Sequence, residues 1–478
     1  MIEITRALAR QLRAVFRKST WAGSLRGIRS PVVFQTDRDG LSVRVYDPEV
    51  AVVHHQPGKY APEALAVPAE VLDDTEGRGE DLISLEANGP QTVQARWTDA
   101  GVPQVRDYDA KDPDNSPAFP ELPPRWTTLE PGLLQALTDA AHTAARDNPR
   151  YAVHRTQLRG AAGEVVATDG RELLIQGGFP FPWQDDLLIP SVGAFALRKV
   201  PQDAPVALGK TDTHVGLRVG PWTFLLTLDK EGRFPNAQHV VPALTGNVTT
   251  CRLSAEDATF LAKALPRLPG GKDEDAPLTL DLNGHLAVRV RGEGQPQATE
   301  VVLSRSAVDG PPVRLVSNRH YLARAVQLGF GEITVMKADV PVVCRDDRRT
   351  YVWMPLGKED ALEPSADTVS IAFQPEIKPS ARPTPERRKA AMPAPKTNGH
   401  DHLSVPDPRP VEDQPAPAPS GLSGLLQEAE ALKEQLRDAY GHSIQLVAAL
   451  KRHRQQSRQM ASALASLRQL QQLPAMDT

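Results

Sequence analysis

The segment Val166-Ala167-Thr168-Asp169-Gly170-Arg171-Glu172-Leu173 gives the clearest indication of the fold. Apolar residues flank an Asp-Gly pair, and this dipeptide tolerates the positive φ that a tight hairpin reversal requires. Comparable pairs occur at Asp39-Gly40, Asn88-Gly89 and Asn283-Gly284. The chain near these turns alternates apolar and polar residues, as in 286–290, which is typical of half-buried strands. The sequence therefore predicts antiparallel hairpins along much of the chain.

Helical patterns recur between these hairpins at a spacing of about 120 residues. Predicted helices open this cycle at residues 4–17, 131–146 and 254–265. A strand that runs into a short helix follows each of them, at residues 66–72, 188–194 and 315–322. Pro at a strand exit, or a Ser-Asn pair as side-chain cap, suits such a helix start. We predict an α+β chain of three tandem repeats, with three unrelated α+β domains as the alternative.

The predicted repeats span residues 1–122, 123–245 and 246–357. Residues 358–420 are rich in Pro, Ala, Ser and charge, which predicts a disordered linker. In residues 421–473 leucines return at helical spacing, which predicts a long helix, coiled coil or helical hairpin with a partner helix. Like units in series can close on themselves, so the repeats favour a ring.

The composition excludes several classes of protein. Cys251 and Cys344 form neither a disulfide framework nor a metal-ligand spacing, which fits a reducing cytoplasm. The pairs His54-His55 and His400-Asp401-His402 also lack the context of a metal site. No Gly-rich phosphate loop or nucleophile elbow occurs, so we expect no enzyme and no cofactor. Because the net charge is -4, any contact with nucleic acid requires local surfaces that are basic.

One stripe of the first predicted helix is entirely basic, and the opposite face is apolar. The stripe consists of Arg6, Arg10, Arg13 and Arg17, and the apolar face of Leu8, Leu12, Val15 and Phe16. Such a helix can pack on a sheet and present guanidinium groups to DNA phosphates without reading bases. A solvated charged face is the alternative. The Arg-rich start is also typical of an organellar transit peptide, but its apolar face favours a folded helix.

Further basic residues extend the predicted contact with double-stranded DNA. These candidates are Arg26, Arg146, Arg150 with Tyr151, Arg198 and Lys199.

Four segments of the middle unit resemble, in order and spacing, the central domain of bacterial DNA polymerase III beta clamps. They are Arg150-Tyr151, the stretch 166–173, Asp229-Lys230-Glu231-Gly232-Arg233-Phe234-Pro235-Asn236 and Val240-Val241-Pro242. The third unit ends in Tyr351-Val352-Trp353-Met354-Pro355-Leu356, which is similar to the terminal signature of that family. The resemblance covers residues 1 to about 357 and is clearest in the middle unit.

The resemblance implies a sliding clamp, the processivity factor of the replicative DNA polymerase. It implies clamp domains joined head to tail in a homodimeric ring, with helices lining a hole around duplex DNA and strands outside. A clamp loader and the polymerase are the implied partners, the nucleoid in the cytoplasm is the implied location, and no enzymatic activity is implied.

The resemblance also implies a hydrophobic cleft between the second and third domains that binds partner peptides. Carried onto this sequence, the cleft consists of Val153, Thr168, Gly170, Arg171, Leu173, Pro235, His239, Val240, Val352, Trp353, Met354 and Pro355. Met is an adaptable wall for such a site. The alternative for the last residues is a core strand that stops at Pro355.

The sequence departs from the family pattern at several positions of this cleft. Arg171-Glu172 replaces the usual His-Arg pair, Ala152 replaces an aromatic residue, Trp353 replaces a small apolar residue, and His239 replaces a basic one. These departures, with the C-terminal extension, favour a second hypothesis. In it the chain is a clamp-derived scaffold, not loaded on DNA, that assembles through its C-terminal helix.

Overall fold

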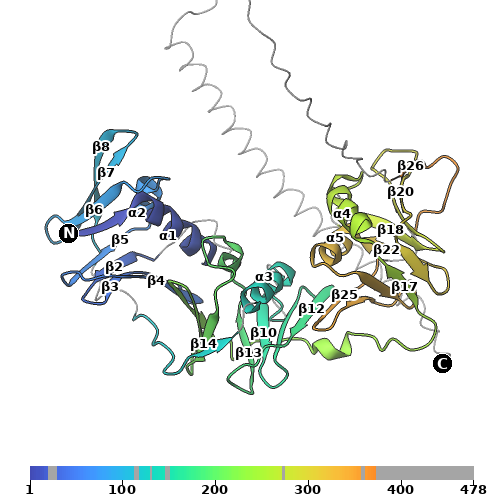
Figure 1. Cartoon of the computed structure of the whole chain (residues 1–478), viewed down its shortest axis with the longest axis horizontal. Helices are drawn as coiled ribbons and strands as arrows, with labels where there is room; N and C mark the ends of the chain where they lie inside the picture. The colour runs from blue at the N-terminus through green and yellow to red at the C-terminus, as the bar shows by residue number, and fades with distance from the viewer. Residues whose placement is uncertain are drawn as a thin grey trace, which may run out of the picture. The chain divides into compact units, whose positions relative to one another are not determined.

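The computed structural model describes residues 1–19, 30–111, 118–129, 132–145, 151–271, 275–356 and 361–372. The chain up to Pro379 forms one compact unit, which contains all of these residues. Within them the strands form four sheets, and the longer helices lie on one side of the strands (Figure 1). The predicted helix in 421–473 lies outside the described residues. No helix among the described residues is long and apolar enough to cross a membrane.

The chain opens with a strand, and the first helix starts two residues later than predicted. β1 spans Ile2–Thr5 and α1 spans Arg6–Ser19. The side chains of β1 alternate between buried and exposed positions, because this segment pairs with a sheet. The hydroxyl oxygen of Thr5 accepts a hydrogen bond from the amide of Leu8 at 3.1 Å. Thr5 therefore caps the helix, and α1 cannot begin before it.

Two sheets are built entirely from strands in the first half of the chain. The four-stranded sheet has the order β1, β6 (Leu82–Ala87), β7 (Thr92–Asp99) and β8 (Val102–Asp109). The eight-stranded sheet has the order β5 (Glu63–Val67), β2 (Val32–Thr36), β3 (Gly40–Tyr46), β4 (Val50–Pro57), β16 (Trp222–Thr227), β15 (His214–Val219), β14 (Val206–Lys210) and β9 (Thr127–Leu129).

The other two sheets contain the later strands. The nine-stranded sheet has the order β13 (Asp186–Pro190), β10 (Arg155–Arg159), β11 (Glu164–Thr168), β12 (Glu172–Gly177), β25 (Arg349–Trp353), β24 (Val342–Arg345), β23 (Glu332–Val335), β17 (Thr249–Arg252) and β21 (Ala307–Asp309). The five-stranded sheet has the order β22 (Val313–Asn318), β18 (Pro277–Leu282), β19 (Leu286–Val290), β20 (Thr299–Leu303) and β26 (Val369–Ala372).

Two antiparallel joints make the larger sheets continuous between segments that lie far apart in the sequence. β4 pairs with β16, and β12 pairs with β25. The first joint is reinforced by the guanidinium of Arg155, which forms two hydrogen bonds with the carboxylate of Glu49, at 2.8 and 2.9 Å. The same guanidinium bonds to Asp229 at 3.2 Å. A bidentate pair of this kind fixes orientation as well as distance, so it holds the joint in register.

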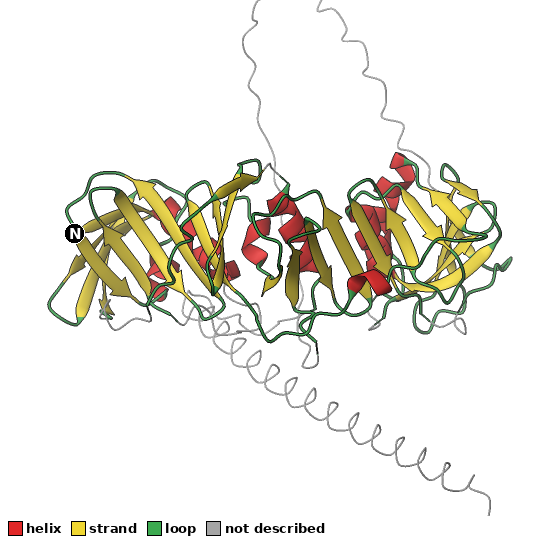
Figure 2. Cartoon of the chain, turned by 90° about the horizontal axis from the view of Figure 1, so that it is seen from below, coloured by secondary structure: helices red, strands yellow, loops and turns green. Residues whose placement is uncertain are grey.

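The helices form a layer in which each element contacts the next. This layer contains α1, α2 (Glu70–Thr75), the 3-10 helix η2 (Gly193–Ala196), α3 (Leu133–Thr143), α5 (Arg319–Gln327) and α4 (Ala255–Ala264). α1 contacts both α2 and η2, η2 contacts α3, and α4 contacts α5. Arg324 of α5 reaches Asp139 of α3 at 3.0 Å and links the two halves of the layer. The strands cross in front of these helices in Figure 2.

One order of elements recurs along the chain. Three consecutive antiparallel strands follow α1 (β2, β3, β4), α3 (β10, β11, β12) and α4 (β18, β19, β20). Three strands likewise follow α2 (β6, β7, β8), η2 (β14, β15, β16) and α5 (β23, β24, β25). The three predicted strand-to-helix passages correspond to the entries into α2, η2 and α5. The middle one forms only a 3-10 turn, since η2 has four residues.

Two local predictions are confirmed by the backbone. Gly170 and Gly284 of the predicted hairpin turns have φ values of 92° and 69°, a region that residues with a Cβ rarely adopt. The side chain of Asn318 accepts a hydrogen bond from the amide of His320, as expected for the predicted cap of α5. In both cases the local sequence alone selects the conformation.

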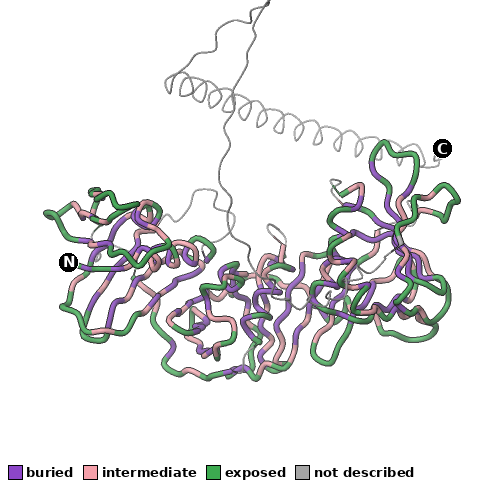
Figure 3. Tube along the Cα trace, turned by 45° about the horizontal axis from the view of Figure 1, so that its top comes forward, coloured by how far each residue is buried: buried purple, intermediate pink, exposed green. Residues whose placement is uncertain are grey.

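The buried residues follow the strands and the inner side of the helices, as the purple trace in Figure 3 shows. One core cluster extends from Ile2 to Leu226 and includes Leu12, Val15 and Phe16 of α1, as predicted for the apolar face of that helix. A second cluster, from Leu174 to Trp353, forms the core behind α4 and α5. Of two further 3-10 turns, η4 (Leu265–Arg267) contributes Leu265 to the second cluster, and η3 (Ala237–His239) contributes Ala237 to a third, smaller one.

A disordered linker is predicted for residues 358–420. Part of this segment is a paired strand, so the prediction is wrong for that part. Residues 369–372 form β26, which pairs with β20. The polar composition of the segment hides a short alternation of Val369 and Ile371 with smaller residues. Four residues suffice for a strand when a sheet edge supplies the hydrogen bonds, and composition alone does not reveal such an edge.

Candidate functional site

Exposed cations gather on the helix layer where α1 meets η2. Arg10, Arg17 and Lys18 of α1 are exposed, and so are Arg198 and Lys199, which follow η2. The side chain of Gln11 donates a hydrogen bond to the carbonyl of Lys199 at 3.3 Å, so the two groups adjoin. We call these five cations the basic helix surface. Lys18 belongs to it although the periodicity of the arginine stripe did not predict it.

Arg6 is not part of this surface, which corrects its predicted role as a phosphate contact. Its guanidinium is buried and donates hydrogen bonds to the carbonyls of Thr75, Glu76 and Thr98, at 3.1, 3.0 and 2.8 Å. Thr75 and Glu76 stand at the C-terminal end of α2, where carbonyl groups lack helical partners. Arg6 therefore caps α2, and a salt bridge to Asp99 at 2.8 Å completes its shell.

Arg13 lies in the stripe but is engaged by acidic residues of α2 and its end. It forms ion pairs with Asp73 and with Glu76, the latter at 3.1 Å. The hydrogen bond that the guanidinium donates to Asp73 raises the pKa of Arg13 above its ordinary value. These carboxylates compete with any phosphate for the guanidinium, which reduces the positive charge that Arg13 offers to DNA.

The remaining predicted DNA contacts divide between described and undescribed residues. Tyr151 is exposed just before β10. Arg26, Arg146 and Arg150 lie outside the described residues, and their predicted role stays a prediction.

A second group of titratable side chains, which includes the ion pair of Arg324 with Asp139, lies at the C-terminal end of α3. Partial burial, together with the positive charges of Arg324 and Lys18, lowers the pKa of His142. These two cations belong to α5 and α1, so three helices contribute charge around one imidazole. A phosphate placed there would favour the protonated imidazole, because an opposite charge raises the pKa of a base.

The joint between β12 and β25 holds a small apolar cluster on the side away from α3. We call it the joint cluster, and its buried members are Val166, Leu173, Ala237, Val343 and Val352. Ile175, Phe234 and Val241 pack against it and are partly buried. The segment around η3 therefore covers this face of the sheet.

The structure places several predicted cleft residues in or beside the joint cluster. Leu173 and Val352 are neighbours across the two strands and belong to the cluster. Met354 follows β25, and its amide donates a hydrogen bond to the carbonyl of Arg171 at 2.9 Å. Met354 and Val240 are 46% and 47% exposed, an unusual state for large apolar side chains.

Other predicted cleft residues shape or flank this region. Thr168 ends β11 and accepts a hydrogen bond from the amide of Gly170, at 3.0 Å, which fixes the hairpin. Arg171 and His239 are exposed, and Arg171 pairs with Asp275 at 2.7 Å. Pro235 and Pro355 are half-buried.

Two predicted cleft residues point elsewhere. Trp353 is fully buried in the core behind α4 and α5, and its indole donates a hydrogen bond to the hydroxyl of Ser317 at 2.9 Å. Successive side chains of a strand face opposite sides of the sheet, so Trp353 cannot share the face of Val352. Val153 is buried too, and its carbonyl accepts a hydrogen bond from the amide of Ala145, just after α3.

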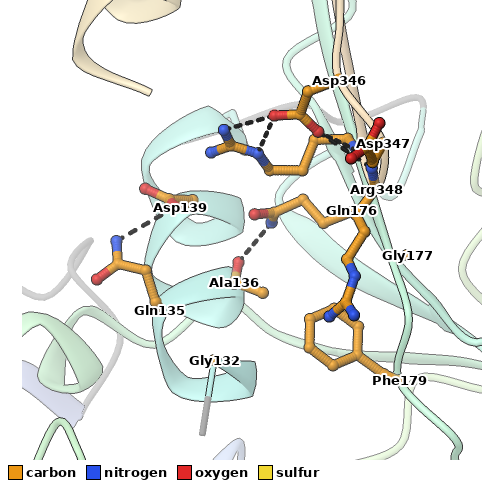
Figure 4. Close-up of a pocket in the computed structure, with 11 residues that line it drawn as sticks. Gly132, Gln135, Ala136, Asp139, Gln176, Gly177, Phe179, Asp346, Asp347 and Arg348 are labelled. Carbon is orange, nitrogen blue, oxygen red and sulfur yellow. Dashed lines mark hydrogen bonds and ion pairs between the residues drawn. The ribbon is translucent and has the colours of Figure 1, made fainter. Parts of the chain in front are cut away.

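A polar cavity of about 510 Å³ lies on the helix side of the same joint, between α3 and the turn that connects β24 to β25 (Figure 4). The side chain of Gln176 spans it and donates a hydrogen bond to the carbonyl of Ala136 at 2.8 Å. Gln135 and Asp139 of α3 line one wall, and Arg348 lines the other. This cavity is distinct from the joint cluster, because residues of β12 alternate between the two faces.

No group of three or more His, Cys, Asp or Glu residues that could hold a metal ion occurs among the described residues. His54 and His55 are both in β4 but do not act together. Burial lowers the pKa of His54 to about 4, and its ring packs against Trp222 with centroids 4.7 Å apart. His55 faces the other side of the sheet and contacts Ser42 at 3.2 Å.

Solved structures of bacterial sliding clamps match this fold over nearly their whole length. A sliding clamp of Pseudomonas aeruginosa, DNA polymerase III subunit beta, solved with griselimycin bound, matches with a TM-score of 0.61 and 20% identity, over 74% of this chain and 99% of that one. The chain has the sliding-clamp fold. The clamp of Bartonella birtlesii bound to griselimycin matches with a TM-score of 0.61 and 19% identity, over 74% of this chain and 99% of that one.

A third match shows how far sequences diverge within the sliding-clamp fold. The putative beta subunit of Eubacterium rectale has the same TM-score of 0.61 and the same coverage, 74% and 99%, at 12% identity. No family model matches the sequence of this chain. No curated protein matches it either.

One position at which the predicted cleft departs from the family pattern lies in the joint between β12 and β25. Glu172 begins β12, and the hydroxyl of Tyr351 in β25 donates a hydrogen bond to its carboxylate. Burial raises the pKa of Glu172 to about 7. The position that departs from the family pattern thus places a weak acid inside the joint, on the face of the sheet opposite to the joint cluster.

Proposed function

We propose that this protein is a DNA sliding clamp, built of three tandem clamp domains (1–122, 123–245 and 246–357). Two copies joined head to tail would enclose duplex DNA at the nucleoid, without reading its sequence. The protein would tether the replicative polymerase and other DNA enzymes, and it would catalyse no reaction. The recurrence of a helix followed by three strands supports the division into like domains.

The observation that carries this proposal is the continuous helix layer with its basic helix surface. Five exposed cations on adjoining elements suit phosphate groups, which carry no base information. Arg6 and Arg13 are engaged by the protein itself, so the surface is only moderately basic. Moderate charge fits a clamp, because a closed ring is retained by topology and must still slide.

Retention on circular DNA tests the proposal. The full chain is loaded by a clamp loader onto a nicked circular plasmid and separated from free protein by gel filtration. We expect the protein to elute with the closed circle and to be released when a restriction enzyme linearises it. Equal retention on linear DNA, or no retention on the circle, would contradict topological linkage.

We further propose that partner peptides bind at the joint cluster, next to Met354 and Val240. Exposed apolar side chains beside a polar rim are typical of a binding surface. Griselimycin, which is bound to the clamps of Pseudomonas aeruginosa and Bartonella birtlesii, supplies a probe. Met354→Glu should weaken its binding at least tenfold, while Leu244→Glu, at another exposed apolar position, should not. Equal affinities of the two variants for griselimycin would show that this surface is not the binding site.

The scaffold hypothesis also rests on a specific observation. Part of the C-terminal extension, β26, pairs with the edge of β20, and the cleft departs from the family pattern at Glu172. If the full chain assembles in solution but is never retained on the circle, the scaffold is favoured over the clamp.

A further inference from the structure

Both internal joints of the chain pair strands of equivalent position. β4 is the last of the three strands that follow α1, and it pairs with β16, the last strand that follows η2. β12 is the third strand that follows α3, and it pairs with β25, the third strand that follows α5. The two pairings are antiparallel. One rule of connection therefore accounts for both joints.

Two strands of equivalent position do not follow this rule within the chain. β8 is the third strand after α2 and forms an edge of the four-stranded sheet, with β7 as its neighbour. It is eight residues long, and its Val102 and Val105 are 56% and 60% exposed. A long edge strand with exposed valines is a template for pairing with another chain. Its counterpart by the same rule is β20, the third strand after α4.

The outer edge of β20 is covered by β26 from the same chain. Thr299 to Val302 pair with Val369 to Ala372 in parallel register. The amide of Val369 donates a hydrogen bond to the carbonyl of Ala298 at 2.9 Å, which starts the ladder. The strand that follows the third unit thus occupies the place that β8 of a second copy would take.

The segment before β26 is anchored along the same sheet. The amide of Leu362 donates a hydrogen bond to the hydroxyl of Thr279 in β18, at 2.9 Å, and Glu363 forms an ion pair with Arg314 in β22. Arg314 in turn bonds to Asp281 at 3.0 Å. Residues 361–372, which we call the strap, therefore run from β22 and β18 to the far edge at β20.

A charged row beneath the strap continues this connection. Asp281 is buried and pairs with Arg289 of β19 at 2.6 Å, and Arg289 pairs with Glu300 of β20 at 2.6 Å. Buried charges are tolerated only when they are paired. The row links the anchor of the strap at Arg314 to the strand whose edge β26 covers.

We propose that β26 is a built-in competitor of ring closure. The inference rests on the proposed head-to-tail ring. β26 covers the β20 edge in the single copy, and it must leave before β8 of a second copy pairs there. The strap thus sets the concentration at which two copies close, and a partner that binds the released strap favours the closed ring.

The geometry of β26 makes it releasable. It contributes four residues in a parallel pair, and parallel pairing is slightly less stable per residue than the antiparallel pairing at the two internal joints. Val369 and Ile371 remain 51% and 39% exposed, so little apolar surface holds the strand. β8 supplies a longer strand with two further valines, which suits it to displace β26.

Two proline substitutions in the full chain test whether the backbone hydrogen bonds between β26 and β20 are what hold β26 in place. Backbone amides alternate in direction along a strand, so the amide of Ile371 faces β20 as that of Val369 does, whereas the amide of Ser370 faces away. Ile371→Pro removes a donor from the ladder. Ser370→Pro introduces the same ring at the neighbouring position without removing a ladder donor, and it is the matched control.

Two measurements on the wild type and both variants test the inference. Amide hydrogen exchange at low protein concentration should show faster exchange in β20 for Ile371→Pro than for Ser370→Pro. Sedimentation should show that Ile371→Pro lowers the dimer dissociation constant at least tenfold, with β8 gaining protection as the dimer forms. Equal exchange in the two variants, or equal dissociation constants, would overturn the inference.

These outcomes are distinct from failure of the proposed function. If Ile371→Pro dimerises more tightly but no variant is retained on circular DNA, the competitor role stands and the clamp function fails. If the wild type is retained on the circle and Ile371→Pro dimerises no better than the control, the clamp function stands and the competitor role fails.

Discussion

The hydroxyl of Tyr351 donates a hydrogen bond to the carboxylate of Glu172, across the joint that binds β25 to β12. The two residues are 179 positions apart in the sequence. Burial raises the pKa of Glu172 to about 7, although the hydrogen bond from Tyr351 acts in the opposite direction. The joint therefore contains a carboxyl group that titrates near neutral pH.

This pKa predicts that the joint weakens as the pH rises. Between about pH 4.5 and 7 the folded state keeps a proton that the unfolded state has released. The stabilising contribution is complete below pH 4.5 and is lost as the pH passes 7. Glu172→Gln keeps a neutral acceptor for Tyr351, so it should be more stable than the wild type at pH 8, by about 2 kcal/mol. Urea denaturation at a series of pH values measures this difference.

Tyr351→Phe is the control for that experiment. Removing the hydroxyl removes the interaction that lowers the pKa of Glu172, so the transition should move to higher pH instead of disappearing. Identical pH profiles for wild type and Glu172→Gln would show that Glu172 does not titrate in the joint.

The basic helix surface predicts a measurable salt dependence of DNA binding. Replacing Arg10, Arg17 and Lys18 with Gln should flatten the dependence of log K on log salt by roughly 0.9 for each lost phosphate contact. Fluorescence anisotropy with a labelled duplex at several salt concentrations gives the slope. Lys59 and Lys230, exposed in loops between strands, supply a Gln control that should leave it unchanged. If the control variant flattened the slope equally, DNA binding would depend on charge spread over the whole protein and not on the basic helix surface.

Arg6 should affect stability and not DNA binding. Arg6→Gln leaves the carbonyls at the end of α2 poorly satisfied and removes the ion pair with the exposed Asp99, at a cost of about 3 kcal/mol. Arg10→Gln, one turn later on the exposed face, should change the free energy of unfolding by less than about 0.5 kcal/mol. Denaturation curves of the two variants, beside their DNA affinities, separate the roles. Comparable stabilities would show that the buried cap is dispensable.

Trp353 should likewise act through the core. Trp353→Phe removes the indole donor to Ser317 and leaves a cavity beside Tyr351, so the free energy of unfolding should fall by about 2 kcal/mol. Met354→Ala, at the neighbouring exposed position, should cost far less. Thermal or chemical unfolding of both variants checks the order, and a reversed order would place Trp353 at the surface.

The sequence by itself determined the features that depend on neighbours along the chain. Asp-Gly and Asn-Gly pairs select hairpin turns because of the φ they tolerate, and Asn318 caps α5 because its side chain reaches an amide two residues later. The apolar face of α1 likewise predicted the burial of Leu12, Val15 and Phe16. Together with the motifs of the middle unit, these features were enough to indicate the sliding-clamp fold.

The tertiary structure alone decided which side chains are free to act. Arg6 and Arg10 share one helical stripe, yet only Arg6 meets the end of α2, and strand alternation sends Trp353 into the core while Val352 faces the joint cluster. The linker composition likewise concealed β26, because a short strand exists only where another strand offers its edge. Burial and pairing arise from segments distant in sequence, and no local pattern encodes which of them will meet.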